Sequence, residues 1–326
     1  MAAKPTPTYR PLLREALRLT WERKSLWVFG LFASLLSTGG IVDVGARGLR
    51  RVEDGSDLLL NVVNDTFTGA DTFGAWIRQV ELLEPGRVTL TVTAAFVLVL
   101  AALVAAFLSQ AALIRGLACT DPQPFHHHMR EGRPFFWRLV CLTLAGKAAQ
   151  GVLLLMASLP LVLVVARGTY ADGLLFVACF LIAFPLSIIA NLVTALAVID
   201  VVRDDRSAAH ALLHAAGRFA GHWLAALELG AVAYLAITGL WVIGGAAIIL
   251  ASLPYGALVA LALYLGSPVL FGLVTVAFGI VVGAIAFAAI GAATTLQYAV
   301  WLRYSLRAEN RRSPLVAKLE RLWRKW

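Results

Sequence analysis

The stretch from residue 268 to residue 302, PVLFGLVTVAFGIVVGAIAFAAIGAATTLQYAVWL, decides the fold of this chain because it contains no charged residue. About 20 apolar residues are enough for a helix to cross the ~30 Å hydrocarbon core of a bilayer. At about 1.5 Å per residue, a helix of this length would extend roughly 50 Å. The stretch therefore predicts a membrane-spanning helix that tilts, bends or projects beyond the membrane.

The rest of the chain repeats this pattern. Of its 326 residues, 60% are hydrophobic and 14% are charged, whereas about a quarter of the residues in a soluble domain are charged. The fold class predicted is all-α, a polytopic membrane helix bundle of about six transmembrane helices. The expected spans are residues 25–43, 88–114, 138–166, 173–200, 223–252 and 268–302. The apolar piece 257–268 is too short to cross and indicates a re-entrant or interfacial segment.

The distribution of basic residues predicts the orientation. Six Lys or Arg residues precede the first span, four lie in 115–138, three in 203–222 and eight in 303–326. Because basic residues concentrate on the cytoplasmic side, both termini are expected there. The N-terminus shows no cleavable signal peptide. The expected location is the bacterial inner (plasma) membrane, crossed several times.

The domain organisation expected is a single integral membrane bundle followed by a short tail. The bundle covers residues 1–313 and includes the external segment 44–87, in which residues 73–83 have helical amphipathic spacing. The tail, residues 314–326, is predicted to be a basic amphipathic cytoplasmic helix.

Amphipathic stretches recur on the cytoplasmic side, and each ends in a tryptophan at the start of a span: Trp27, Trp137 and Trp223. An indole suits the membrane–water interface. The fold therefore includes repeated cytoplasmic amphipathic interfacial helices.

Polar residues line one face of these stretches and of the tail, recurring every four positions in the first two groups below, and we interpret them as facing lipid headgroups. They are Arg10, Arg14 and Arg18 near the N-terminus, Arg206, His210, His214, Arg218 and His222 in the middle, and Lys318, Arg321, Arg324 and Lys325 in the tail. Anionic phospholipids are the expected partner, with another membrane protein or a second copy as a further possibility. Nucleic acid is not expected, since the excess of basic residues flanks spans.

The histidines of HHH, residues 126–128, allow three interpretations. An interfacial surface is favoured, and modulation by pH or a metal site are the alternatives. Adjacent helical positions point about 100° apart, so one ion cannot easily bind all three. His210 and His214 have chelating spacing, but no nearby carboxylate or cysteine completes a ligand set. No metal or other cofactor is expected.

Polar side chains within the spans are few, and such groups usually face protein or water. The candidates are Lys147, Gln150, Asn191, Thr194, Glu228 and Gln297. Lys147 and Glu228 occupy the same half of the membrane, which predicts an ion pair. Hydrogen bonds that fix helix register are favoured over a substrate or ion path.

Motifs of catalysis are absent from the sequence, which contains no nucleophile elbow, phosphate-binding loop or zinc-protease motif.

Two stretches resemble a group of uncharacterised bacterial six-span proteins. They are residues 195–231, ALAVIDVVRDDRSAAHALLHAAGRFAGHWLAALELGA, and residues 16–35, ALRLTWERKSLWVFGLFASL. These six-span proteins are similar to the membrane domain of some glycerophosphodiester phosphodiesterases. The resemblance implies a membrane module without catalytic residues. The expected function is a non-enzymatic, lipid-interacting scaffold or accessory subunit of a membrane complex. A small-solute or lipid transporter is the alternative.

Overall fold

The computed structural model describes residues 9–37, 85–119, 125–167 and 169–310. Every regular element in these ranges is a helix, which confirms the all-α fold class. The elements are α1 (Tyr9–Glu22), α2 (Leu26–Ser37), α6 (Pro85–Ala118), α7 (Phe125–Gly132), the 3-10 helix η1 (Arg133–Phe135), α8 (Phe136–Arg167), α9 (Tyr170–Asp204), α10 (Ala208–Gly221), α11 (Trp223–Tyr264) and α12 (Pro268–Asn310). The segment predicted to be external, up to residue 84, and the tail 314–326 lie outside the described residues.

Among the described residues, five helices are long and apolar enough to cross a membrane, which makes the chain a multi-pass membrane protein. Their apolar stretches are Thr89–Ala118, His126–Pro160, Tyr170–Asp204, Trp223–Tyr264 and Pro268–Arg307. The remaining expected span, residues 25–43, begins with α2, which has 12 residues. At about 18 Å, α2 by itself is too short to cross the hydrocarbon core. Among the described residues, the structure therefore supports five of the six spans.

The prediction of a re-entrant piece at 257–268 is wrong. Helix α11 continues through Pro254 to Tyr264 and is 42 residues long. It ends in a Schellman motif, in which Ser267 N–H donates to the Ala262 carbonyl at 3.1 Å and Gly266 N–H donates to the Leu263 carbonyl at 3.1 Å. Gly266 has a φ of +60°, which a residue without a Cβ adopts at no steric cost. The Pro-Tyr-Gly sequence at 254–256, which resembles a helix break, lies inside a continuous helix.

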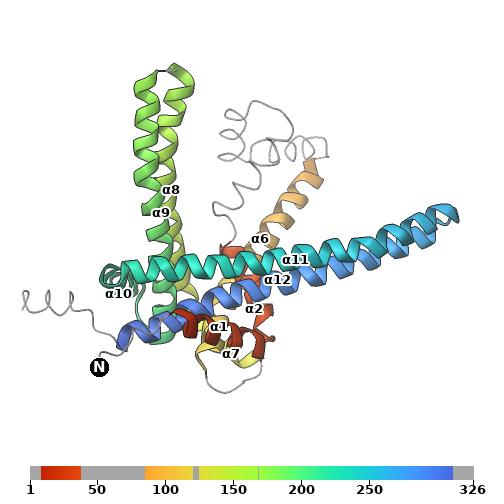
Figure 1. Cartoon of the computed structure of the whole chain (residues 1–326), viewed down its shortest axis with the longest axis horizontal. Helices are drawn as coiled ribbons and strands as arrows, with labels where there is room; N and C mark the ends of the chain where they lie inside the picture. The colour runs from red at the N-terminus through yellow and green to blue at the C-terminus, as the bar shows by residue number, and fades with distance from the viewer. Residues whose placement is uncertain (1–8, 38–84, 120–124, 168, 311–326) are drawn as a thin grey trace, which may run out of the picture. The chain divides into compact units, whose positions relative to one another are not determined.

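The chain divides into two compact units. The first comprises Met1–Ser34, Leu108–Gly151 and Leu186–Trp326, and the second comprises Leu35–Phe107 and Val152–Pro185. In the second unit, the end of α8 and the start of α9 form a helical hairpin (Figure 1). Rings of Phe176, Phe180 and Phe184 contact one another along α9 at centroid distances of 6.0 and 5.6 Å.

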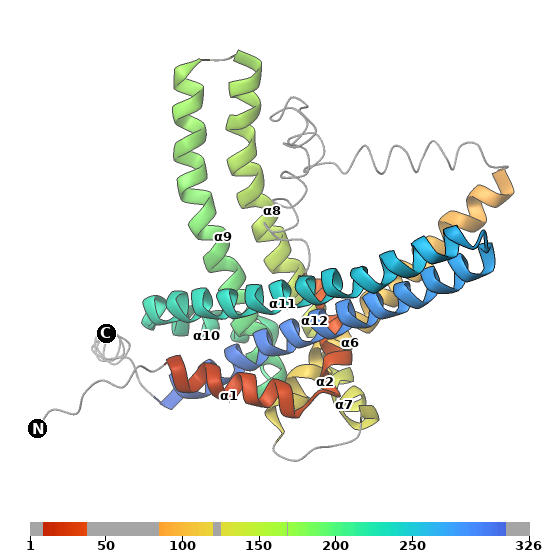
Figure 2. The ribbon, with the colours of Figure 1, turned by 45° about the vertical axis from the view of Figure 1, so that its right-hand side comes forward.

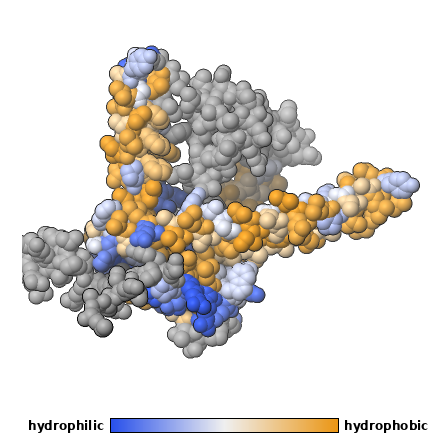
Figure 3. Space-filling view, viewed as in Figure 1, coloured by the Kyte–Doolittle hydropathy of each residue, from blue (hydrophilic) through white to orange (hydrophobic). Residues whose placement is uncertain are grey.

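In the first unit, α11 and α12 run side by side over most of their length (Figures 1 and 2). Tyr255 of α11 stacks on Phe278 of α12, with ring centroids 4.1 Å apart. Large apolar side chains such as Leu250 and Ile280 remain more than two-thirds exposed on the outer surface of this pair. Figure 3 shows the pair covered with hydrophobic residues, as expected for helices whose surroundings are lipid.

The core of the first unit lies around the second half of α12. Helix α1 packs along α12 and buries Leu12, Ala16 and Leu19. Arg307 of α12 also pairs with Glu15 of α1 at 2.9 Å. The apolar positions of α1 recur at helical spacing, so its apolar face packs on α12 and its opposite face is exposed.

Helices α2 and α12 approach most closely at two glycines. A Cβ built at Gly30 would lie 2.5 Å from the carbonyl oxygen of Gly291, and a Cβ built at Gly291 would lie 2.5 Å from the carbonyl oxygen of Trp27. Small residues let membrane helices come into backbone contact in this way. Gly291 is the point of contact on α12, whereas a Cβ at Gly279 or Gly283 of the same helix would meet nothing within 4 Å.

Candidate functional site

A cluster of charged and polar side chains lies where α9, α10 and α12 meet within the first unit. At its centre is Asp200 of α9, which is completely buried between apolar neighbours from Leu196 to Val202. A lone buried carboxylate would be very costly, so it requires partners of opposite charge or hydrogen-bond donors. We call this group the Asp200 cluster, and its members are Asp200, Arg203, His214, Arg218 and Ser305.

Arg218 of α10 supplies the main partner of Asp200. Its Nη2 donates to both carboxylate oxygens, at 2.9 Å to Oδ1 and 2.8 Å to Oδ2. The Arg218 side chain is only 6% exposed, so both charges are largely removed from water. Hydrogen bonds between ionised groups are stronger than neutral ones. The pair therefore holds α10 against the end of α9.

Ser305 connects the same cluster to α12. Its hydroxyl oxygen accepts from Arg218 Nη1 at 2.7 Å and from Arg203 Nη1 at 3.1 Å. Both lone pairs of this oxygen are thus used, and Ser305 is completely buried. Its role in this arrangement is that of an acceptor that joins three helices, since it is neither accessible nor next to a base.

His214 has two competing contacts. Its Nδ1 lies 2.9 Å from Asp200 Oδ2 and 2.8 Å from Arg218 Nη2. A protonated Nδ1 donates to Asp200, whereas an unprotonated Nδ1 accepts from Arg218, and one nitrogen cannot do both at once. Asp200 already has Arg218 as its counter-charge, so His214 reinforces a pair that is complete without it.

These contacts correct the predicted orientation of α10. The sequence interpretation placed His214 and Arg218 on a headgroup-facing stripe, but both turn toward buried Asp200. His210 is exposed and contacts Ser207 Oγ through Nδ1 at 2.9 Å. Arg206 and His222 are half-buried, and Arg206 lies 3.5 Å from Asp204. The sequence pattern separated the polar face of α10 from its apolar face correctly. It assigned the polar face to lipid headgroups, whereas His214 and Arg218 on that face contact the protein.

On helix α1, two of the residues predicted to face headgroups are exposed. Arg14 and Arg18 are exposed on the side opposite Leu12 and Ala16. Arg18 donates to Glu22 at 2.6 Å, and this hydrogen bond, with the charge of Glu22, raises the pKa of Arg18 above its ordinary value. Nothing is described of the Arg10 side chain or of Lys318, Arg321, Arg324 and Lys325.

The polar residues predicted inside the spans do not come together. Lys147 and Glu228 are both exposed, and no ion pair joins these two described residues, so that prediction is wrong. Asn191 is exposed, while Gln150 and Gln297 are half-buried. Among the described residues, the helices that carry these side chains, α8, α9, α11 and α12, therefore form no shared polar path.

Two side-chain hydrogen bonds within the helices involve polar groups of the predicted kind. One is made by Thr194, which was predicted, and the other joins two residues that were not among the candidates, Gln110 and Tyr298. Thr194 donates to the Ala190 carbonyl at 2.7 Å, and its side chain lies against Gly146 of α8. Gln110 of α6 donates to the Tyr298 hydroxyl at 2.6 Å, next to the predicted Gln297. The expectation that polar groups fix helix register is therefore met at Gln110 and Tyr298. An aspartate at the end of an apolar span, Asp200, was the sequence signal for the larger cluster.

The three adjacent histidines diverge, as their helical spacing predicts. His126 is exposed, His127 Nδ1 lies 3.6 Å from Glu131 Oε1, and His128 is buried. Nearby, the guanidinium of Arg115 lies 4.9 Å from the centre of the Phe135 ring. Within the described residues, no three His, Cys, Asp or Glu side chains gather as they would around a metal ion.

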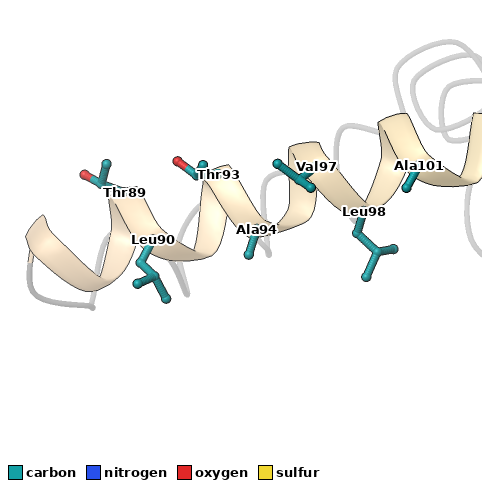
Figure 4. Close-up of a pocket in the computed structure, with 7 residues that line it drawn as sticks. All are labelled: Thr89, Leu90, Thr93, Ala94, Val97, Leu98 and Ala101. Atoms are coloured by element: carbon teal, nitrogen blue, oxygen red, sulfur yellow. The ribbon is translucent and has the colours of Figure 1, made fainter.

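Two pockets of the structure are apolar. One lies along α6 and is lined by Thr89, Leu90, Thr93, Ala94, Val97, Leu98 and Ala101 (Figure 4). The other lies between α11 and α12, around Tyr255 and Phe278. Neither is lined by a charged side chain or by a member of the Asp200 cluster. No family model, curated protein or solved structure matches this chain.

Proposed function

We propose that this chain is a non-enzymatic protein of the bacterial inner membrane that binds anionic phospholipid and acts as a scaffold or accessory subunit of a membrane complex. In this proposal both termini are cytoplasmic. The resemblance to the membrane domain of glycerophosphodiester phosphodiesterases is part of the same proposal and rests on residues 16–35 and 195–231.

One observation carries the proposal, namely the placement of α1. Its apolar face is fixed on α12, its outer face presents Arg14, Arg18 and Trp21, and Lys24 lies exposed in the turn that follows; Trp21 is 59% exposed. The Lys24 ammonium lies 5.8 Å from the centre of the Trp21 ring. Basic side chains beside an exposed indole are typical of a helix at an anionic membrane surface. Figure 3 shows hydrophilic residues gathered at this part of the first unit.

The transporter alternative rests on the polar residues of spans three to five. Lys147 and Glu228 remain apart, and both described pockets are apolar. No arrangement of the described residues therefore favours that alternative over lipid binding.

Lipid binding through α1 predicts a charge-dependent stabilisation. Phosphatidylglycerol added to the full-length protein in neutral mixed micelles should raise its thermal unfolding midpoint, whereas phosphatidylcholine should have little effect. Each basic residue near an anionic surface contributes about 1 kcal/mol. The Arg14→Gln/Lys24→Gln variant should then need roughly 30-fold more phosphatidylglycerol for the same shift.

The matched control is Arg167→Gln. Arg167 is an exposed basic residue at the C-terminal end of α8 and does not belong to α1. This control should keep the wild-type response. Salt near 1 M should reduce the response of the wild type, since it shortens the Debye length to about 3 Å. Equal stabilisation by both lipids, or an unchanged phosphatidylglycerol requirement in the double variant, would contradict the proposal.

The proposed topology predicts where cysteine reagents reach the protein. Tyr170 is 97% exposed between α8 and α9, and Arg130 is exposed on α7. In a background with Cys119, Cys141 and Cys179 replaced by alanine, an impermeant maleimide should label Tyr170→Cys in spheroplasts and label Arg130→Cys only after lysis. Labelling of Arg130→Cys in intact spheroplasts would show that the protein has the opposite orientation in the membrane.

A further inference from the structure

Apart from His210 at its edge, the outward face of α10 contains no side chain that can hydrogen-bond to water or to a headgroup. It is made of Ala209, Leu212, Leu213, Ala216, Gly217 and Ala220, all of them exposed. Leu213 is 72% exposed. A helix on the surface of a water-soluble protein shows the opposite arrangement, with its polar residues outside. The surroundings of this face are therefore apolar.

The rotation of α10 is fixed by what lies on its other side. Ala211 and Ala215 are fully buried and Phe219 is 7% exposed. Arg218 and His214 bond to buried Asp200 from the same side. Turning the leucines inward would pull Arg218 away from Asp200 and leave that carboxylate buried without its partner. The leucine face is thus held outward by the Asp200 cluster.

The face is also continuous with the outer surface of a membrane-spanning helix. Only His222 separates α10 from α11, and the first residues of α11, Trp223 and Leu224, are 54% and 64% exposed. A tryptophan at the start of a span marks the membrane–water boundary. Helix α10 has 14 residues, about 21 Å, which is too short to cross the membrane. It therefore begins at that boundary without a span of its own.

We propose that α10 lies in the plane of the membrane, with Leu212 and Leu213 inserted among the acyl chains of the leaflet next to the start of α11. The occupant of the face is acyl chain because the face carries no cationic side chain that would select a headgroup phosphate. His210 lies exposed at the edge of this face and remains at headgroup level. This inference rests on the proposed membrane placement of the protein and adds a hydrophobic contact to the electrostatic one of α1.

A spin label attached at single cysteines tests this placement in the full-length protein reconstituted in phosphatidylcholine vesicles. The native cysteines are first replaced by alanine, and Leu213→Cys is compared with Leu250→Cys, on the exposed surface of α11, and with Tyr170→Cys, in the α8–α9 turn. Collision with oxygen reports apolar surroundings, and collision with a nickel complex reports water. The label at 213 should resemble the label at 250, with oxygen access several-fold above nickel access relative to position 170.

Two outcomes would overturn the inference. Nickel access at 213 equal to that at 170 would place α10 in water. Broadening by a second spin label, removed by dilution with unlabelled protein, would show that another copy of this chain covers the face. Because acyl-chain contact needs no lipid charge, the label at 213 reports on α10 in neutral vesicles even if the phosphatidylglycerol response of α1 is absent.

Discussion

Replacing Asp200 with alanine should lower the free energy of unfolding by about 3–5 kcal/mol, because Arg218 then remains buried without a counter-charge. Equilibrium unfolding in mixed micelles, followed by circular dichroism, measures this loss. The matched control is Asp205→Asn, because the Asp205 side chain is 70% exposed although it pairs with Arg138. An exposed pair contributes no more than about 1 kcal/mol, so the control should change little.

A double replacement separates the ion pair from simple loss of packing. Asp200→Leu combined with Arg218→Met removes both charges, and apolar residues of similar size often substitute for a buried pair at little cost. The double variant should therefore be more stable than Asp200→Ala. Additive losses for the two positions, or a loss at Asp200 no larger than at Asp205, would show that the pair does not hold the helices together.

Substitution of Gly291 by alanine should destabilise the protein by about 1–3 kcal/mol, although alanine is the better helix former. The added Cβ would lie 2.5 Å from the Trp27 carbonyl oxygen and 2.9 Å from the Trp27 Cβ, so α2 and α12 must separate. Leucine at the same position should be worse. A shift of the unfolding transition under the same conditions measures the effect.

Gly283→Ala is the matched control on the same helix. A Cβ at Gly283 meets no other atom within 4 Å, so the substitution should stabilise α12 by up to about 1 kcal/mol. The two variants are therefore expected to shift stability in opposite directions. A gain of stability in both would mean that α2 and α12 do not touch at Gly291.

The sequence predicts the helices well because an apolar run without charges has few other structures in a membrane. It fails at 254–256, where Pro254 suggests a break. Membrane helices tolerate a proline when the backbone groups that it leaves unpaired find other partners, and α11 continues past Pro254 to Tyr264. Five of the expected spans follow from hydropathy and recur as long apolar helices among the described residues.

The candidate site is harder to predict, since periodicity defines the two faces of a helix but not which one meets the protein. In α10 the polar positions pointed to headgroups, and the structure turns two of them toward Asp200. The decisive residue was the buried acid on α9, 18 positions away from Arg218. Lys147 and Glu228 matched in depth along their helices, but depth alone does not place two side chains on facing surfaces. Tyr298 and Ser305 gave no signal because single hydroxyls are common on apolar helices.

The length of the α11–α12 hairpin sets a condition on the bilayer around it. From Leu229 to Tyr264, α11 carries no charged residue, and at about 1.5 Å per residue this apolar part is roughly 54 Å long. Keeping it inside a ~30 Å hydrocarbon core would need an inclination of about 55° from the membrane normal, beyond the usual range of 0–40°. The hairpin is therefore in positive hydrophobic mismatch. Lipids beside it must stretch their chains at a modest free-energy cost, which is smaller in a thicker bilayer, so the protein should prefer, and locally produce, a thicker membrane.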